Sequence, residues 1–245
     1  MSREVEIGTQ DEDSNAPEEY TFNDVSVVMG TYNEEKAIRS VLRDIKGATD
    51  EKAEIVCVDG SSDRTPDIAR ELGAKVIRQE PQGYGVAVRE AILTPDREVI
   101  ITTDCDDTYP MERLPDFLEY INQGYDVVSG DRITKGAEEM PRLNEFGNRA
   151  FVLLASLLTG KRFYDTTTGM RAYRRDVVRG IDWTENTGLS AELLIRPAMR
   201  GYKVKEIPIE YSERKGETKL NPFTGGAAIA KSIVKVSLEE RFNGY

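Results

Sequence analysis

The sequence predicts one α/β domain built on a doubly wound, mostly parallel β-sheet. Short runs of β-branched apolar residues alternate with segments whose apolar residues recur at helical spacing, which is typical of a sheet with crossover helices. Several of these runs end in polar or acidic turns, which should meet at one edge of the sheet, where open α/β sheets bind ligands. The length of 245 residues suits one large domain of this kind.

Strands and helices alternate through the first half of the chain. Five strands are expected at residues 25–29, 53–58, 74–77, 99–103 and 126–130. Four helices are expected at about residues 38–45, 66–72, 83–93 and 114–123. The second helix has Pro66 in its first turn, where Asp63 or Thr65 can cap it.

The two ends of the chain differ from its centre. Residues 1–23 are acidic and polar and are expected to form a disordered extension before a domain at residues 24–222. Residues 223–245 are expected to form a C-terminal amphipathic helix. The apolar run Phe151–Leu158 predicts either a core helix or a helix at a membrane interface.

The composition excludes several kinds of chemistry. The chain contains no histidine, so Ser-His-Asp, Cys-His and histidine–metal sites cannot form from its own residues. The net charge of −11 argues against binding nucleic acid through bulk charge. Acidic residues spread along the chain and an excess of Arg over Lys indicate adaptation to high salt. Cys57 and Cys105 lie in or after apolar runs and are expected to be buried thiols.

An acidic cluster follows the strand expected at residues 99–103. Asp104 and Asp106 are two residues apart, so in an extended chain their side chains point the same way. Two adjacent carboxylates repel each other unless a cation lies between them, and carboxylate oxygens suit Mg²⁺ or Mn²⁺. We therefore expect a metal site at Asp104 and Asp106, with a solvated acidic turn as the alternative.

No glycine-rich phosphate motif accompanies the acidic cluster. The first strand is followed by the residues GTYNEE at positions 30–35 rather than by G-x-G-x-x-G, and the P-loop pattern is absent. Gly83-Tyr84-Gly85 follows a strand but lacks the third glycine. A diphosphate at this acidic edge would need a bridging metal, which indicates a metal-bound nucleoside diphosphate as the ligand.

The order and spacing of several motifs resemble family-2 glycosyltransferases, which are inverting nucleotide-sugar enzymes with the GT-A fold. The matching stretches are residues 31–34, 58–65, 104–106 as the D-x-D motif, 130–132, 165–175, 206–211 and 214–220. The last two are similar to the polyprenyl-phosphate branch, the dolichyl-phosphate mannose and glucose synthases. With the acidic composition, the resemblance points to a haloarchaeal member.

For the donor side, the resemblance implies a nucleotide-sugar held by five residues and a divalent metal, Mg²⁺ or Mn²⁺. Tyr32, Glu34 and Asp59 would contact the nucleoside. Asp104 would approach the ribose and the metal, and Asp106 would hold the metal on the diphosphate.

A late loop would close over the donor phosphates through Arg214 and Lys219, again by resemblance. The sequence departs from the family pattern at three positions. Val58 occupies the first position of the usual Asp-Asp pair, Arg64 replaces a glycine, and Thr218 replaces the usual serine.

For the acceptor side, the resemblance implies a phosphate held by arginines. Arg132 would meet this phosphate, with Arg142 as the second arginine and Arg149 as its competitor. Asp165 would order these arginines or contact the sugar. Guanidinium groups suit phosphate oxygens. An ionised phosphate needs no general base, which fits a chain without histidine.

We therefore expect a metal-dependent inverting transferase that moves a hexose from UDP-glucose or GDP-mannose to a polyprenyl or dolichyl phosphate. Such a reaction would be the first step toward lipid-linked glycans for protein glycosylation. The alternative is a family-2 transferase that acts on a sugar hydroxyl with Glu192 as base, although Glu192 could instead pair with Arg196 at i,i+4. A nucleotidyltransferase and a nucleotide-sugar-binding subunit are further alternatives.

The expected partners follow from this reaction. We expect a cytoplasmic protein in peripheral contact with the cytoplasmic face of the membrane, and no nucleic-acid partner. The sequence does not predict the oligomeric state.

Overall fold

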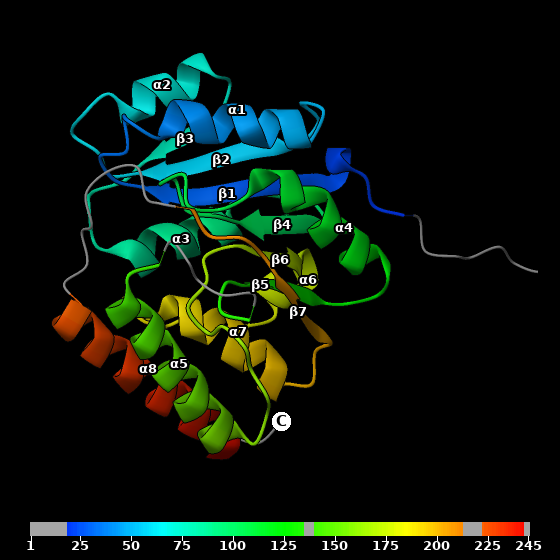
Figure 1. Ribbon diagram of the computed structural model, residues 1–245. Coiled ribbons are helices and arrows are strands. Elements are labelled where there is room, and N and C mark those ends of the chain that lie inside the picture. Colours follow the sequence, from blue (N-terminus) through cyan, green and yellow to red (C-terminus); the bar gives the residue numbers. More distant parts are fainter. Residues whose placement is uncertain (1–18, 135–139, 213–221, 243–245) are drawn as a thin grey trace, which may run out of the picture.

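The computed structural model describes residues 19–134, 140–212 and 222–242 (Figure 1). The sheet has seven strands in the order β3-β2-β1-β4-β6-β5-β7. The strands are β1 (Val25–Thr31), β2 (Glu54–Asp59), β3 (Lys75–Arg78), β4 (Val99–Thr102), β5 (Val127–Asp131), β6 (Arg171–Arg174) and β7 (Val204–Pro208). The predicted doubly wound, mostly parallel α/β fold is confirmed.

One strand runs against the others. β6 lies between β4 and β5 and is antiparallel to both, with Ile101 opposite Ala172 and Val128 opposite Ala172 on its other side. The sequence pattern does not show this direction, because the direction of a strand depends on its pairing partners. Because β6 is reversed, its first residues lie at the sheet edge where β4 and β5 end.

Helices cover both faces of the sheet. They are α1 (Ile38–Ala48), α2 (Thr65–Glu71), α3 (Tyr84–Leu93), α4 (Leu114–Asn122), α5 (Arg142–Thr159), α6 (Arg175–Arg179), α7 (Leu189–Met199) and α8 (Pro222–Phe242). Two short 3-10 turns, η1 (Phe22–Asp24) and η2 (Met111–Arg113), precede β1 and α4.

Alternate residues along each strand divide the core between the two faces, as the pleat of a strand requires. In β4, Ile101 packs with the apolar side chains of α1, α2 and α4, whereas Ile100 packs with those of α3, α6 and α7. Both residues are fully buried. The strands therefore contribute to two cores at once, which explains their continuous apolar runs.

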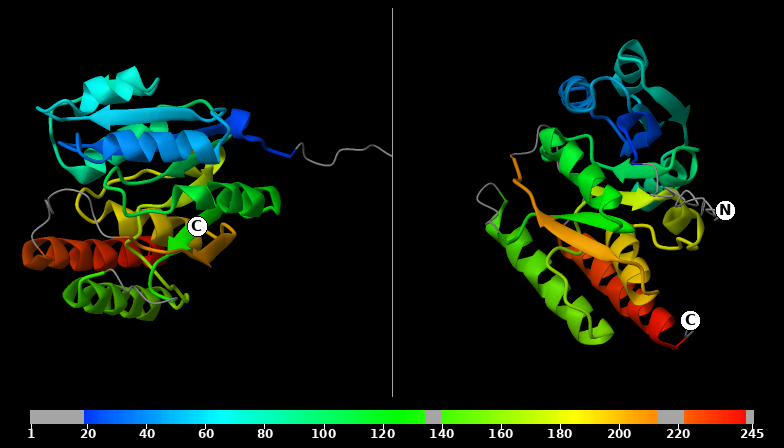
Figure 2. Two further views of the ribbon diagram at one scale, coloured as in Figure 1. Left: turned by 45° about the horizontal axis from the view of Figure 1, so that its top comes forward. Right: turned by 90° about the vertical axis from the view of Figure 1, so that its right-hand side faces the viewer.

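Helix α7 also separates the sheet from a pair of outer helices. Its residues Leu189 and Leu193 pack on the sheet, whereas Leu194 and Ile195 pack against α5 and α8. The views in Figures 1 and 2 show α5 and α8 side by side at the edge of the molecule opposite α1 and α2. The apolar side of α8 includes Ile233, which is fully buried, so this amphipathic helix packs on the domain.

The described part of the N-terminal segment packs on the domain. Tyr20 exchanges two backbone hydrogen bonds of 2.9 Å with the side-chain amide of Asn122 in α4. Phe22 packs against the core on the α1 side. Residues 19–23 therefore belong to the fold rather than to the expected extension, and residues 1–18 lie outside the described residues.

None of the helices in the described ranges is long and apolar enough to cross a membrane.

Replacing Ile101 by Ala should lower the free energy of unfolding by about 2–5 kcal/mol, because a fully buried side chain in the central strand leaves a cavity. Urea unfolding measures this loss. Leu153→Ala is the control, since Leu153 is 60% exposed and its loss should cost less than about 1 kcal/mol. Equal losses in the two variants would contradict the assignment of the core.

Candidate active site

A cavity of about 810 Å³ lies at the carboxyl ends of β1, β2 and β4. The three polar turns predicted to meet there follow neighbouring strands, so that expectation is confirmed. On the sheet side the cavity is lined by Gly30, Thr31, Tyr32, Glu34, Gly60, Gln79, Pro81, Gln82, Gly83, Tyr84, Ala87, Asp104, Cys105 and Asp106. From the loops next to β5, β6 and β7 it is lined by Arg132, Thr167 and Tyr211. On the helical side its lining includes Met140, Leu143, Asn144, Phe146, Asn148, Phe151, Ser190 and Ile229.

The two carboxylates of the acidic cluster both line this cavity. Asp106 is buried, and its Oδ1 accepts hydrogen bonds from the Thr108 N–H at 3.2 Å and from the Thr108 hydroxyl at 2.6 Å. Asp107 has a φ of 67°, a left-handed conformation that Asp tolerates, so the chain turns directly after Asp106. Asp104 lies against Gly169, where an added Cβ would be 2.5 Å from the Asp104 Oδ2 atom.

These carboxylates suit a divalent metal that also binds phosphate. In the described residues, no group of three or more Asp, Glu, His or Cys side chains could hold a metal ion alone. Mg²⁺ commonly takes one or two carboxylates and completes its shell with water and substrate phosphates. Asp104 and Asp106 therefore fit a metal whose remaining ligands come from a bound diphosphate.

Asp59 lies behind the cavity wall. Its carboxylate is fully buried and accepts hydrogen bonds from the Thr31 hydroxyl at 2.6 Å, from the N–H and hydroxyl of Ser61, and from the Arg78 guanidinium. Thr31 and Gly60 line the cavity, whereas Asp59 does not. The structure therefore places Tyr32 and Glu34 at the site but gives Asp59 no direct access to a ligand.

A buried ion pair forms part of the cavity wall directly after β5. The Arg132 Nε donates to Asp165 Oδ2 at 2.6 Å, and Nη2 donates to Asp165 Oδ1 and to Thr167 at 3.0 Å. Its Nη1 points to the Tyr109 hydroxyl at 3.3 Å, and the guanidinium lies 5.5 Å from the Tyr211 ring centroid. Arg132 lines the cavity, whereas Asp165 is fully buried behind it.

The pair stabilises both charges. Burial alone would raise the pKa of Asp165, but the adjacent Arg132 guanidinium outweighs burial and holds this pKa below its usual value. Burial alone would lower the pKa of Arg132, but Asp165 holds it well above its usual value. Arg132 therefore keeps its positive charge inside the site.

The structure does not bring the other predicted arginines to the cavity. Arg142 begins α5 as an exposed residue, and Arg149 is exposed and pairs with Glu145 at 2.8 Å. Neither lines the cavity, and Arg214 and Lys219 lie outside the described residues. Of the described residues, Arg132 is the arginine in the cavity wall.

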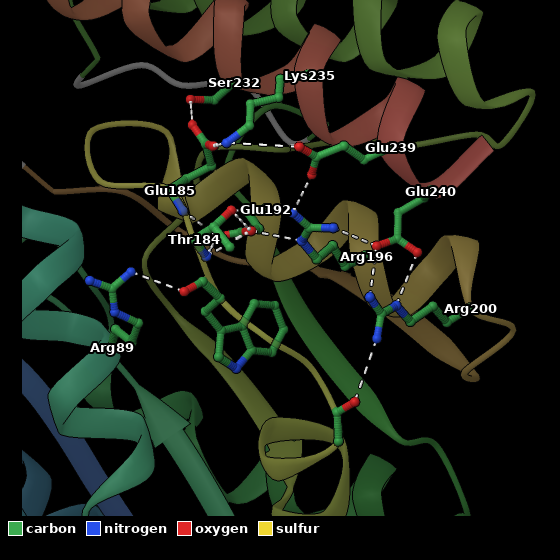
Figure 3. A network of polar contacts seen from close by, with 12 residues as sticks. Arg89, Thr184, Glu185, Glu192, Arg196, Arg200, Ser232, Lys235, Glu239 and Glu240 are labelled. Atoms are coloured by element: carbon green, nitrogen blue, oxygen red, sulfur yellow. Dashed lines mark hydrogen bonds and ion pairs between the residues drawn. The ribbon is translucent and has the colours of Figure 1, made fainter. Parts of the chain in front are cut away.

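Glu192 is held in a network of charged side chains (Figure 3). It does not line the cavity. It is fully buried and accepts the Arg196 Nε–H at 2.7 Å, together with the backbone N–H groups of Thr184 and Glu185. Arg196 also pairs with Glu240 of α8 at 2.5 Å. The i,i+4 pairing considered for Glu192 is what the structure shows, and a role as general base is not supported by this position.

Several lining residues were not singled out from the sequence. Asn144 and Asn148 face the cavity from α5, and the Asn148 side-chain oxygen accepts the Thr167 hydroxyl at 3.0 Å. Their i,i+4 spacing would indicate a shared helix face only if the helix was known to begin near Arg142. The sequence analysis singled out only the apolar run from Phe151. The Tyr109 hydroxyl, which accepts the Gly169 N–H at 2.6 Å, had no such signal.

Comparison with known proteins agrees with this geometry. Residues 26–182 match the model of glycosyl transferase family 2. The chain therefore belongs to glycosyl transferase family 2, and it is a glycosyltransferase. The resemblance drawn from the sequence motifs is confirmed.

Two relatives are informative. The chain is 74% identical over 223 residues to the dolichyl-phosphate hexose transferase of Haloferax volcanii, covering 91% of this chain and 98% of that protein. It is 28% identical over 236 residues to the undecaprenyl-phosphate mannosyltransferase of Micrococcus luteus, covering 90% of this chain and 96% of that protein.

A solved structure shows the same fold. Glucosyl-3-phosphoglycerate synthase of Mycobacterium tuberculosis, in complex with Mn²⁺, UDP-glucose and phosphoglyceric acid, superposes with a TM-score of 0.70 at 20% identity. The match covers 88% of this chain and 79% of that chain. The GT-A assignment of the fold is confirmed.

Glu206 in β7 lies next to the Arg132–Asp165 ion pair and has a raised pKa. Its carboxylate accepts the Tyr164 N–H at 3.1 Å and the Asp165 N–H at 2.9 Å. Burial raises the pKa of Glu206 from 4.5 to about 7, and the nearby negative charge of Asp165 adds to the effect.

The contribution of Glu206 to the stability should therefore fall as the pH rises from about 4.5 to about 7, because the folded state binds the Glu206 proton more tightly than the unfolded state does. Above the folded pKa this contribution is lost. Glu206→Gln keeps an acceptor oxygen but does not titrate, so it should flatten the dependence of the melting temperature on pH in this range. An unchanged slope in this variant would contradict the assignment.

Proposed function

We propose that this protein transfers a hexose from a nucleoside-diphosphate sugar to a polyprenyl phosphate such as dolichyl phosphate. The observation that carries the proposal is one cavity lined by two carboxylates after β4, a buried guanidinium after β5, and apolar side chains of α5 and α8. A relative named dolichyl-phosphate hexose transferase, 74% identical over nearly the whole chain, supports it.

The donor would bind on the sheet side. Asp104 and Asp106 would hold a divalent metal, Mg²⁺ or Mn²⁺, which when bound neutralises charge on the diphosphate oxygens. Tyr32 and Glu34 would contact the nucleoside from the turn after β1. Asp59 would act through Thr31 and the 60–61 turn, which its hydrogen bonds hold in place.

The acceptor phosphate would bind at Arg132. A guanidinium fixed by Asp165 and Thr167 is pre-oriented, so little side-chain entropy is lost when it binds a phosphate. Asn144 and Asn148 line the cavity next to it and would donate further hydrogen bonds. Arg142 and Arg149 stay as proposed contributors that would have to turn toward the ligands. Arg214 and Lys219, which lie outside the described residues, stay as proposed contacts to the donor phosphates.

The reaction needs no protein base. A phosphate oxygen of the acceptor would form a bond to the anomeric carbon while the bond from that carbon to the donor diphosphate breaks. The electron pair leaves with the nucleoside diphosphate, and attack from the opposite face would invert the anomeric centre. Fixed positive charge in a site shielded from water stabilises the developing charge on the leaving group.

The lipid chain and the membrane would meet the protein at α5. Four large apolar side chains are strongly exposed along this helix: Leu143, Phe146, Leu153 and Leu157. Their spacing places them on one face, and the first two also line the cavity. The exposed Arg142 and Arg149 on the same helix would attract anionic head groups. We propose peripheral contact with the cytoplasmic face of the membrane through this helix.

Incubation with radiolabelled UDP-glucose or GDP-mannose, Mn²⁺ or Mg²⁺, and dolichyl phosphate in detergent and molar KCl should move label into an acid-labile, organic-soluble product. The active donor identifies the base and the sugar. Asp106→Ala should abolish the transfer and leave the folded structure intact, as measured by circular dichroism. Metal removal by EDTA should have the same effect.

Two outcomes would contradict the proposal. Normal turnover by Asp106→Ala would exclude the metal role of this carboxylate. Transfer to a sugar hydroxyl but not to dolichyl phosphate, lost in Glu192→Gln and kept in Arg132→Ala, would establish the alternative with a protein base.

Replacing Leu153 and Leu157 by Ser should weaken binding to phosphatidylglycerol vesicles by roughly tenfold or more, since each buried leucine contributes about 1.5–3 kcal/mol. Co-sedimentation measures the bound fraction. Leu93→Ser is the matched control, because Leu93 is 43% exposed at the end of α3 and away from this face. Equal binding by all three proteins would exclude α5 as the contact.

A further inference from the structure

The Gly83-Tyr84-Gly85 turn forms part of the donor side of the cavity, but it is not a phosphate-binding motif. It connects β3 to α3, and Gln82, Gly83 and Tyr84 all line the cavity. Gly83 has a φ of 110°, a conformation that other residues rarely adopt. Close contacts with Asn186 explain why both positions are glycine.

The side-chain amide of Asn186 binds the two ends of this turn. Its Oδ1 accepts the Gly85 N–H at 2.9 Å, and its Nδ2 donates to the Gln82 carbonyl oxygen at 3.0 Å. A Cβ added at Gly83 would lie 2.7 Å from this amide, and one added at Gly85 would overlap the Asn186 backbone. The glycines therefore allow Asn186 to lie directly on the turn.

The residue between the glycines reaches the predicted metal site. The Tyr84 hydroxyl lies 3.4 Å from the Asp104 Oδ1 atom and 3.5 Å from the Ser190 hydroxyl. All three residues line the cavity. The conformation of the turn thus decides where the phenol stands relative to Asp104.

The segment that carries Asn186 is fixed independently of its side chain (Figure 3). Arg89 of α3 donates to the Trp183 carbonyl at 2.9 Å, and Glu192 of α7 accepts the backbone N–H groups of Thr184 and Glu185. The Glu185 carboxylate pairs with Lys235 of α8 at 2.6 Å. Three helices therefore hold this segment, so removal of the Asn186 amide should free the turn without moving the segment.

We propose that Asn186 is a positioning residue for the donor side of the cavity: its amide fixes the 82–85 turn and so holds Tyr84 beside Asp104. The proposal rests on the donor site described above. It does not depend on the identity of the acceptor, because its contacts join Asn186, the 82–85 turn and Asp104 and include none of the residues proposed to hold the acceptor.

The test compares Asn186→Ala and Asn186→Asp with a matched control, Asn122→Ala. Asn122 also bridges a backbone N–H and a carbonyl, those of Tyr20, but at α4 and away from the cavity. Three quantities are measured: amide hydrogen exchange at Gly85, calorimetric binding of UDP and of GDP in Mn²⁺, and the KM for dolichyl phosphate.

Asn186→Ala should speed Gly85 exchange and weaken binding of the preferred nucleotide by roughly five- to tenfold, the effect of about one lost hydrogen bond. The KM for dolichyl phosphate should stay within about twofold of the unmodified value. Asn186→Asp keeps the acceptor for the Gly85 N–H and should restore slow exchange. Asn122→Ala should change none of the three quantities.

Unchanged nucleotide binding in Asn186→Ala, despite faster exchange, would overturn the positioning role. Equal weakening of nucleotide binding and acceptor KM would also overturn it, because that result indicates a general loss of structure. Hydrogen exchange and nucleotide binding need no acceptor, so these outcomes differ from a failure of the proposed lipid-phosphate transfer.

Discussion

The reversed direction of β6 determines how the site is assembled. A strand that is antiparallel to β4 and β5 begins where those two strands end. The loop before β6 therefore lies at the carboxyl edge of the sheet, and it brings Asp165 to Arg132 and Gly169 to Asp104. In a wholly parallel sheet this loop would lie at the opposite edge, and the buried guanidinium would have no carboxylate beside it.

The two sides of the cavity differ in how they hold charge. On the sheet side, Asp104 and Asp106 concentrate negative charge that a metal can neutralise. After β5, Arg132 carries a positive charge whose cost of burial is offset by Asp165. The cavity therefore offers acidic side chains and a buried guanidinium within one wall, which is the combination that the proposed transfer between two phosphate-bearing molecules would use.

Much of this arrangement could be predicted from the sequence, and the misses have physical causes. Continuous β-branched apolar runs placed the strands, helical spacing placed the helices, and strand ends placed Asp104 and Asp106, because these signals are local. The direction of β6 and the burial of Asp59 depend on distant partners such as β5 and Arg78. Arg142 lies in none of the matched motifs and was chosen over Arg149 as the second acceptor arginine. The packing of α5 against α8 decides which face of that helix meets the cavity, and this face carries Asn144 and Asn148.

The charged network between α7 and α8 combines ion pairs that dissolved salt screens poorly with one that it screens well. Arg196, Glu192 and Glu240 have side-chain exposures of 6%, 0% and 3%, whereas Lys235 is 46% exposed. Mobile ions screen exposed pairs within about one Debye length but reach buried pairs poorly. Concentrated salt therefore weakens the exposed ion pair of Lys235 with Glu185. The buried ion pairs of Arg196 with Glu192 and Glu240 are little affected. Helix α8, whose residue Ile229 lines the cavity, keeps its position across a wide range of ionic strength.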